Sequence, residues 1–464
     1  MSSTPEPPAQ SPNPSTASTS GNGYAGYSSR YTYYVLGMVF LTMIFSQIDR
    51  SIVSILVGPI KDEFDLSDTQ MGFLMGPAFA VVYGLLVLPL GRYADTSGIR
   101  RNIVSGSVFL WSLFTVGAGL VTSHAQLILM RMGVGVGEAG ATAPSISLLS
   151  DYLTPEKRGR GLSVVSNGAV IGLGLGMVLG GAVEEAYGWR AALVAVGAPG
   201  ILLAIVYRLT VQEPVRGGSE GRRAPAKLPF AESLRSLRAT KTYLFILAAN
   251  GFSLFASMGR NMWEPAFLMR TYEMGTFEGA TWYALTSPFP SMIGIFLGGY
   301  LVDRLGARDK RFYLWVPAFG LGVSVPILIV FILWPETHFL TLPGFLADTA
   351  FATMPVALVW SFVGSVVGGL FTAPFMATTQ AVVPLRVRAF AAAISTLIST
   401  LIGLAGGPLL TGAIADALEP TYGRDALRYA LLVPTSLPLI SVVFCVVGAR
   451  FVEGDLARSR TLDA

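Results

Sequence analysis

Cysteine, histidine and charged residues are all scarce in this 464-residue chain. A single cysteine, Cys445, excludes a disulfide framework and any paired-cysteine metal or redox site. The two histidines, His124 and His338, lie far apart without ligand spacing around them, so we expect no metal and no other cofactor. The sequence also lacks the pattern G-x-x-x-x-G-K-[ST], which argues against an ATP-driven pump. No nucleophile has a base beside it, and we therefore expect no enzyme.

The composition is dominated by apolar residues. Only 13% of the residues are charged and 52% are hydrophobic, and the mean hydropathy is +0.58, whereas soluble domains carry roughly 25% charged residues. A helix needs about 20 mainly apolar residues to cross a bilayer. The runs are continuous rather than alternating, which favours helices over a barrel. We predict an all-α membrane protein with twelve spans near 33–57, 69–91, 102–122, 125–149, 161–183, 190–211, 242–269, 280–302, 312–334, 354–380, 389–414 and 427–449.

The basic residues indicate the orientation. If the N-terminus is cytoplasmic, most Lys and Arg outside the spans lie on the cytoplasmic side. The other side then has only Lys61, Arg190, Arg270, Arg424 and Arg428. The positive-inside rule therefore predicts a multi-pass protein of the cell membrane with both termini in the cytoplasm. The net charge of +4 reflects this topology and does not suggest a nucleic-acid partner.

Two polar segments predict the domain boundaries. Residues 1–30 are rich in Ser, Pro, Thr and Gly, which predicts a disordered tail without a signal peptide. Residues 212–241 predict a cytoplasmic linker, with a short amphipathic helix around 230–237 on the membrane surface. The expected bodies are a six-helix bundle at 31–211 and another at 242–452, followed by a cytoplasmic tail at 453–464.

One loop motif occurs twice. Residues 91–101 and residues 299–309 both read G-x-x-x-D-x-x-G followed by arginine, and each stretch joins two apolar runs. Such a long period indicates two related halves rather than a short solenoid repeat. Duplicated halves in a membrane are typical of transporters.

Polar residues interrupt three of the predicted spans. On a helix they form one stripe in each span. An ionised side chain at the bilayer centre costs about 2.5 to 3.5 kcal/mol even on the lenient insertion scale, so we expect these stripes to face a shared central cavity. The stripes include Thr42, Ser46, Asp49 and Arg50 in the first span, Arg131 and Glu138 in the fourth, and Asn250, Ser257, Arg260 and Glu264 in the seventh.

The charged members of these stripes suggest distinct roles. Arg50 is the candidate for the anionic head of a substrate, because a guanidinium stays charged and can form two parallel bonds to a phosphate or carboxylate. Asp49 is the candidate proton carrier. Glu138 either neutralises Arg50 or Arg131, or is a second protonation site. Arg131 and Glu138 together are either a structural pair or direct substrate contacts. Arg260 and Glu264 lie near the outer end of the seventh span, and they suggest an outer gate or an interfacial anchor.

The repeated loop motif resembles that of major facilitator superfamily transporters, over roughly residues 31–452. This resemblance implies two pseudo-symmetric six-helix bundles and a cytoplasmic latch in each half. In the first latch, which includes Gly91, Asp95 would receive backbone donors and Arg101 would pair with Asp151. The second latch has Gly299, Asp303 and Arg308. It is expected to be weaker, because residues 378–380 contain no acid that matches Asp151.

A finer resemblance lies in the first and fourth spans. Asp49 and Arg50, the run Arg131-x-x-x-Gly135-x-Gly137-Glu138-Ala139 and Ala143-Pro144 are similar to the Spinster-homologue branch. That branch implies an amphipathic anionic lipid as substrate, such as a lysophospholipid or a sphingosine 1-phosphate-like molecule. It also implies proton coupling in some members. We expect a secondary transporter that opens alternately to each side and works as a monomer, with protons and the lipid bilayer as its other partners. A proton-coupled symporter of small organic anions and a receptor that does not translocate its ligand stay open as alternatives.

Overall fold

A computed structural model describes residues 27–214, 230–342, 344, 349 and 351–463. Nearly all of the tail predicted at 1–30, and residues 215–229 of the predicted linker, lie outside these ranges. The described residues 27–211 form the N-terminal half. Its helices are α1 (Ser29–Ile55), α2 (Val57–Phe64), α3 (Asp68–Met75), α4 (Pro77–Ser97), α5 (Arg100–Ala118), α6 (His124–Ala139), α7 (Thr142–Tyr152) and α8 (Pro155–Thr210).

The C-terminal half begins after a short helix, α9 (Phe230–Ala239), at the position predicted for an amphipathic helix. Its remaining α-helices are α10 (Lys241–Tyr272), α11 (Thr276–Thr286), α12 (Pro288–Gly306), α13 (Phe312–Leu333), α14 (Ala357–Gly369), α15 (Thr372–Val382), α16 (Arg388–Ile398), α17 (Ala405–Tyr422), α18 (Ala426–Ser436), α19 (Pro438–Gly448) and α20 (Val452–Asp463). A π-helical segment, η4 (Ser399–Leu404), joins α16 to α17, and two 3-10 turns are η3 (Leu385–Val387) and η5 (Gly423–Asp425).

Every predicted span corresponds to helix, which confirms the all-α membrane fold. Among the described residues, eight helical stretches are long and apolar enough to cross a bilayer by themselves. Two of them, Lys157–Thr210 and Phe390–Gly448, are long enough to cross twice at about 1.5 Å per residue. α8 turns back at Gly188, whose φ of 82° is a left-handed conformation that favours glycine. The predicted spans 102–122 and 125–149 correspond to α5 and to α6 with α7.

Two segment ends have structure that the apolar runs do not indicate. The tenth span was expected to begin at 354, but Thr353–Pro355 is a strand, β2, which pairs antiparallel with β1 (Phe339–Thr341). Most residues of the predicted cytoplasmic tail at 453–464 belong to α20, and their place in the cytoplasm stays a prediction. The carboxylate of Asp455 in α20 accepts a hydrogen bond of 2.7 Å from the main-chain N–H of Thr242, so the start of α10 holds this helix in place.

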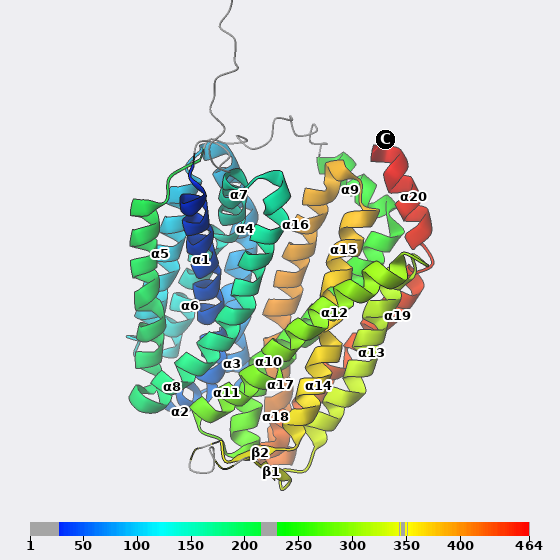
Figure 1. Cartoon of the computed structure of the whole chain (residues 1–464). Coiled ribbons are helices and arrows are strands. Elements are labelled where there is room, and N and C mark those ends of the chain that lie inside the picture. Colours follow the sequence, from blue (N-terminus) through cyan, green and yellow to red (C-terminus); the bar gives the residue numbers. More distant parts are fainter. Residues whose placement is uncertain (1–26, 215–229, 343, 345–348, 350, 464) are drawn as a thin grey trace, which may run out of the picture.

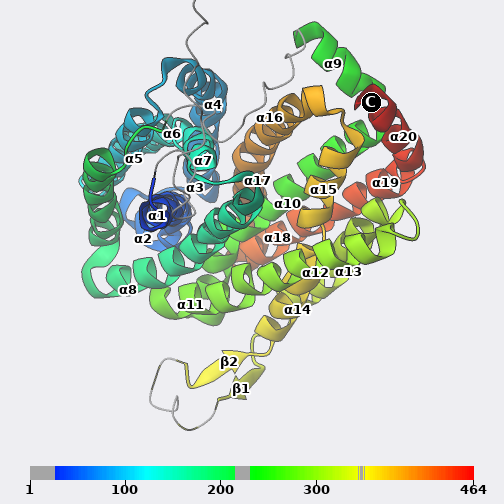
Figure 2. The same cartoon turned by 45° about the horizontal axis from the view of Figure 1, so that its top comes forward.

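The two halves stand side by side (Figures 1 and 2). The start of α1 and the helix α20 lie at one face of the molecule, which we call the terminus face. α2 and the β1–β2 hairpin lie at the other, which we call the opposite face (Figure 1). Near the opposite face the halves touch through α3 against α17 and through α8 against α11. A Cβ at Gly412 in α17 would lie 2.2 Å from the main-chain oxygen of Asp68, so this approach requires glycine.

Candidate functional site

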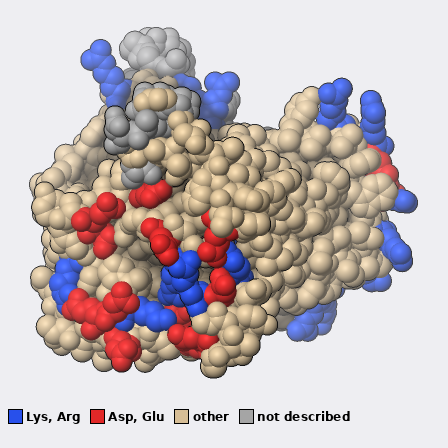
Figure 3. Space-filling view, turned by 90° about the horizontal axis from the view of Figure 1, so that it is seen from below, with Lys and Arg blue, Asp and Glu red and all other residues tan. Residues whose placement is uncertain are grey.

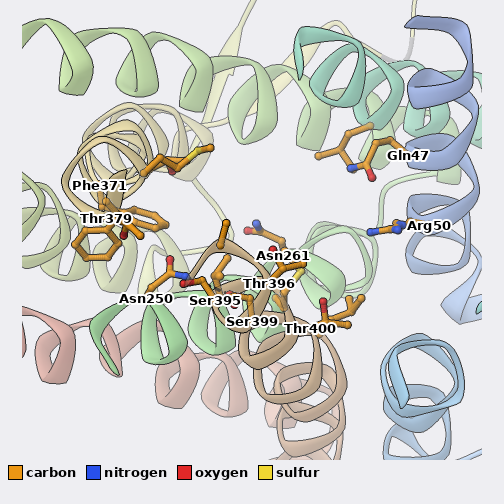
Figure 4. A pocket seen from close by; sticks show the side chains of 18 of the residues that line it. Gln47, Arg50, Asn250, Asn261, Phe371, Thr379, Ser395, Thr396, Ser399 and Thr400 are labelled. Carbon is orange, nitrogen blue, oxygen red and sulfur yellow. Dashed lines mark hydrogen bonds between the residues drawn. The ribbon is translucent and has the colours of Figure 1, made fainter. Parts of the chain in front are cut away.

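A cavity of about 490 Å³ lies between the two halves. Most of its lining is apolar, and the apolar side chains include Leu173, Met177, Leu254, Met258, Met262, Phe371, Phe375 and Met376. Amides and hydroxyls line the rest, and several of them gather on α10, α16 and η4 (Figure 4). Among the described residues that line the cavity, Arg50 alone carries a charge, and Figure 4 shows it across the cavity from Asn250.

The Arg50 side chain binds a buried acid behind the cavity wall. Its Nε and Nη2 atoms both lie 2.5 Å from Oε2 of Glu138, and Ser46 donates to the same oxygen at 3.2 Å. The Arg50 side chain is 24% exposed, whereas that of Glu138 is 1% exposed. α1 thus supplies the arginine and α6 the carboxylate. The opposite charges meet because neither could face hydrocarbon alone.

Phe79 and Tyr83 of α4 flank the same guanidinium, with their ring centroids 5.0 and 4.9 Å from its central carbon. Such contacts stabilise a cation while leaving its N–H groups free to donate. The aromatic pair therefore holds the Arg50 side chain at the cavity wall without competing for a ligand.

A second ion pair adjoins the first and is looser. Nη1 of Arg131 lies 3.7 Å from Oδ1 of Asp49, which is too long for a hydrogen bond, and 3.4 Å from the main-chain oxygen of the same residue. The hydroxyl of Thr115 in α5 donates to Oδ2 of Asp49 at 2.6 Å. Both charged side chains are buried, and neither lines the cavity.

The four charges balance, but their hydrogen bonding is incomplete. Oδ1 of Asp49, Nε of Arg131 and Oε1 of Glu138 are buried without a hydrogen-bond partner in the described part of the chain. Buried polar atoms without partners are rare, because each costs roughly 1 to 3 kcal/mol. The two ion pairs are therefore held by fewer hydrogen bonds than their charged groups can form.

The predicted polar residues of the cavity separate into two groups. Asn250 lines the cavity and donates to Ser399 of η4 at 3.1 Å. Ser257 receives a hydrogen bond from Asn261, which lines the cavity in its place. Thr42 is fully buried and donates to the main-chain oxygen of Met38, so the expectation that it faces the cavity was wrong. Ser46 is also buried, and its hydroxyl donates a hydrogen bond to Glu138.

Arg260 and Glu264 form an ion pair within α10. Glu264 is fully buried, and its other oxygen accepts a hydrogen bond of 2.9 Å from Ser361 of α14. Interfacial anchoring is therefore the wrong interpretation for this glutamate, because an anchor would reach the bilayer surface.

The first latch uses a different arginine from the predicted one. Nη1 of Arg100 lies 2.6 Å from Oδ2 of Asp151. The Arg101 side chain instead reaches Asn102 and the main-chain oxygen of Val211. Neighbouring helical residues point about 100° apart, so only one of the two arginines can face α7. The side chain of Asp95 lies outside the described residues.

Sequence reasoning missed Glu213 in this latch. One of its oxygens accepts from Nε of Arg100 at 2.9 Å, and the other accepts from the main-chain N–H of Arg101 at 2.6 Å. The acid thereby caps the start of α5 and ties it to the segment that follows α8. The position of this acid just after the sixth span was the available signal.

The residues of the predicted second latch are not paired with each other here. The side chains of Asp303 and Arg308 are exposed and make no hydrogen bond or ion pair with other described residues. A Cβ at Gly299 would lie 3.6 Å from Ala373 of α15, and one at Gly91 would lie 4.0 Å from Ala143 of α7. Both motif glycines therefore face the neighbouring helix of their own half.

Sequence reasoning also missed a set of contacts across the two halves. Asp68, at the start of α3, forms ion pairs of 2.8 Å with Lys61 of its own half and with Arg270 of α10. Asp416 of α17 accepts hydrogen bonds from the main-chain N–H groups of Asp68 and Thr69, at 2.8 and 2.7 Å.

A third contact joins the halves nearby. Glu185 of α8 accepts from the main-chain N–H of Phe277 in α11 at 3.0 Å. All three sets of contacts lie at the opposite face, where Figure 3 shows acidic and basic side chains intermingled. These contacts join the two halves at that face.

Known proteins support the same architecture. The family model described as Major Facilitator Superfamily matches residues 39–355. The chain is 29% identical over 437 residues to an MFS-type efflux pump of Mycolicibacterium smegmatis, covering 94% of this chain and 96% of that protein. It is 26% identical over 446 residues to protein spinster homolog 1 of Bos taurus, covering 92% of this chain and 81% of that protein.

A solved structure is similar over the whole fold. It is a bacterial homolog of the human lysosomal transporter Spinster in an inward-facing and unoccupied conformation. It matches with a TM-score of 0.82 and 28% identity, covering 92% of this chain and 99% of that chain.

Proposed function

The chain belongs to the Major Facilitator Superfamily of membrane transporters, and from this premise we propose that it moves an amphipathic anionic lipid by proton-coupled alternating access. The substrate class is a lysophospholipid or a sphingosine 1-phosphate-like molecule. Similarity to protein spinster homolog 1 and to the bacterial Spinster homolog supports a carrier of this branch.

One observation supports the substrate class most directly. A single charged side chain, Arg50, is found among the described residues that line a mostly apolar cavity. A guanidinium binds a phosphate through two parallel N–H donors, and the methionine and phenylalanine side chains of the opposite wall suit an acyl chain. A small, fully polar solute would leave that wall without a partner.

Proton coupling follows from competition for Arg50. Glu138 occupies two of the donor groups of Arg50, at Nε and Nη2. A proton on Glu138 would release the guanidinium to the anionic head. Asp49, which lies in the adjoining ion pair with Arg131, would take or pass on that proton. Because proton and anion would each favour binding of the other, the two events are thermodynamically linked.

Alternating access would use the two halves as moving bodies, with boundaries near 31–211 and 242–452, within a monomer. The contacts of Asp68, Asp416 and Glu185 would hold the opposite face closed in the state described above. We assign the terminus face to the cytoplasm, because Lys and Arg dominate the loops there. The first latch of Arg100, Asp151 and Glu213 would stiffen that end of the N-terminal half.

Two measurements test this proposal. In proteoliposomes, counterflow of a labelled lysophospholipid separates a carrier from a receptor, because a receptor binds the probe without exchanging it across the membrane. In detergent, long-chain lysophospholipids should displace a bound fluorescent analogue, while short carboxylates should not. Displacement by short carboxylates at similar concentrations would favour the alternative, a small organic-anion symporter of the same superfamily.

A further inference from the structure

A second hollow lies at the terminus face, between the first turns of α1 and of α8. It has a volume of about 230 Å³ and is separate from the central cavity. Its lining includes Lys157 and Arg160, both exposed, and neither side chain makes a hydrogen bond or ion pair with another described residue. Two unpaired cations at the rim of a hollow are not required by the transport mechanism proposed above.

The residues of the hollow follow the same spacing on both helices. On α1 they are Ser29, Thr32, Tyr33 and Leu36, and on α8 they are Lys157, Arg160, Gly161 and Val164. Each set is spaced i, i+3, i+4 and i+7, which places it on one helix face. Gly161 lies close to Leu153, because a Cβ at that position would lie 2.3 Å from a methyl group of that side chain.

Both helices begin at the terminus face and run in the same direction (Figure 1). The hydroxyls of α1 and the two cations of α8 therefore share the outer end of the hollow. Leu36 and Val164 lie at its inner end, about 10 Å deeper at 1.5 Å per residue. The hollow is thus cationic at the level of the membrane surface and apolar towards the bilayer interior.

Aromatic side chains mark the depth of this site. Tyr33 at the rim is 65% exposed, and Tyr152, which also lines the hollow, packs against Tyr27 and Tyr31 with ring centroids 4.8 and 6.0 Å away. Tyrosines with one polar and one apolar end are typical of the level of the lipid headgroups.

We propose that this hollow binds the headgroup of an acidic phospholipid from the leaflet at the terminus face. Lys157 and Arg160 hold the phosphate, with the hydroxyls of Thr32 and Thr154 beside it. The volume is smaller than the roughly 300 to 1,000 Å³ of pockets that enclose a whole small ligand. The site therefore takes the headgroup and first carbons, and the acyl chains remain in the bilayer. Clusters of basic residues beside membrane helices recognise acidic lipids in this way.

The test measures binding of a fluorescent phosphatidylglycerol to the purified full-length protein in detergent. Phosphatidylcholine, which is zwitterionic and has no net charge, is the control lipid. The double variant Lys157→Gln and Arg160→Gln should bind phosphatidylglycerol about 30-fold more weakly. This corresponds to about 2 kcal/mol, or about 1 for each basic residue near the surface, at 1.4 kcal/mol per tenfold. The matched control is Arg304→Gln with Arg308→Gln, which removes two exposed cations from the other half.

A second variant, Val164→Trp, keeps both cations and fills the apolar end of the hollow, so it should also weaken binding. Equal affinity in the control and in both of these variants overturns the proposal. Displacement of the lipid by sn-glycerol 3-phosphate at matched concentration overturns it too, because that result would indicate a site for free phosphate rather than for a lipid. Failure of transport in counterflow has no bearing on this result, since the hollow lies outside the transport pathway.

Discussion

Asp416 offers the sharpest test of how the halves close. Its carboxylate in the C-terminal half accepts two main-chain hydrogen bonds from the first turn of α3 in the N-terminal half. Hydrogen bonds to a charged group contribute about 1.5 to 3 kcal/mol each, and an asparagine retains one bond of neutral strength near 1. Because Asp416 is half-exposed, we discount the difference to about 1 to 2 kcal/mol for Asp416→Asn.

This loss should shift the balance between the closed and open forms of the opposite face about 5- to 30-fold towards the open form. The assay is pulsed electron spin resonance between nitroxides at Asp62→Cys in α2 and Glu419→Cys in α17, both exposed on that face. The background carries Cys445→Ala, because that buried thiol is the one native cysteine. The expected result is a larger share of long distances in the variant.

Glu63→Gln is the matched control for the same face. The carboxylate of Glu63 binds Arg190 and accepts from the indole of Trp189 at 2.8 Å, and all three residues belong to the N-terminal half. Removing this acid should leave the distance distribution unchanged. An unchanged distribution in the Asp416 variant, or an equal shift in the Glu63 control, would refute the assignment of Asp416 as a contact that closes the opposite face.

Three further predictions concern the coupling site, the packing between halves and pH. Asp49→Asn should abolish the response of lysophospholipid uptake to an imposed pH gradient, and a retained response rules out its proton role. Gly412→Ala should open the opposite face in the same spin-label assay, since overpacking costs typically 1 to 3 kcal/mol; Gly106→Ala, with nothing within 4 Å of the added carbon, should not. Hydrogen bonds from Arg190 and Trp189 lower the pKa of Glu63 below its ordinary 4.5. Its stabilisation is therefore present above pH 4.5 and lost as the pH falls through the lower folded value, so the difference in melting temperature between wild type and Glu63→Gln should shrink below pH 4.5. A constant difference would contradict this.

The sequence could predict that Arg50 and Glu138 meet, because the bilayer makes an unpaired charge so costly that opposite charges on neighbouring helices must find each other. The spacing of apolar runs predicted the helices for a similar reason, since lipid leaves no alternative for the backbone. The sequence could not predict that Arg50, alone among the charged side chains that the structure describes, would line the cavity. Exposure to the cavity depends on the rotation of α1 by a fraction of a turn, and a stripe of polar residues does not fix that rotation.

Other parts of the structure depend on positions that no local pattern encodes. Arg100 rather than Arg101 faces Asp151 because α5 begins at Arg100, and a shift of one residue would reverse the roles. The pair of Asp68 and Arg270 joins two loop-end charges from different halves, each of which is indistinguishable in sequence from an ordinary interfacial charge. Such contacts depend on how the two bundles pack against each other, which local sequence patterns do not predict.

The central claim is that Arg50 binds the anionic head of the substrate. Lipid binding by a variant that lacks both charges of the Arg50–Glu138 pair tests this claim most directly. The double variant Arg50→Gln and Glu138→Gln removes the cavity charge and leaves no buried carboxylate without its cation. Its affinity for an anionic lysophospholipid should fall at least 30-fold, since loss of one partner of a buried charged hydrogen bond costs about 2 to 5 kcal/mol. Its affinity for an uncharged monoacylglycerol of the same chain length should be unchanged. An equal loss for both ligands, or no loss for either, would contradict the assignment of Arg50 as the group that binds the anionic head.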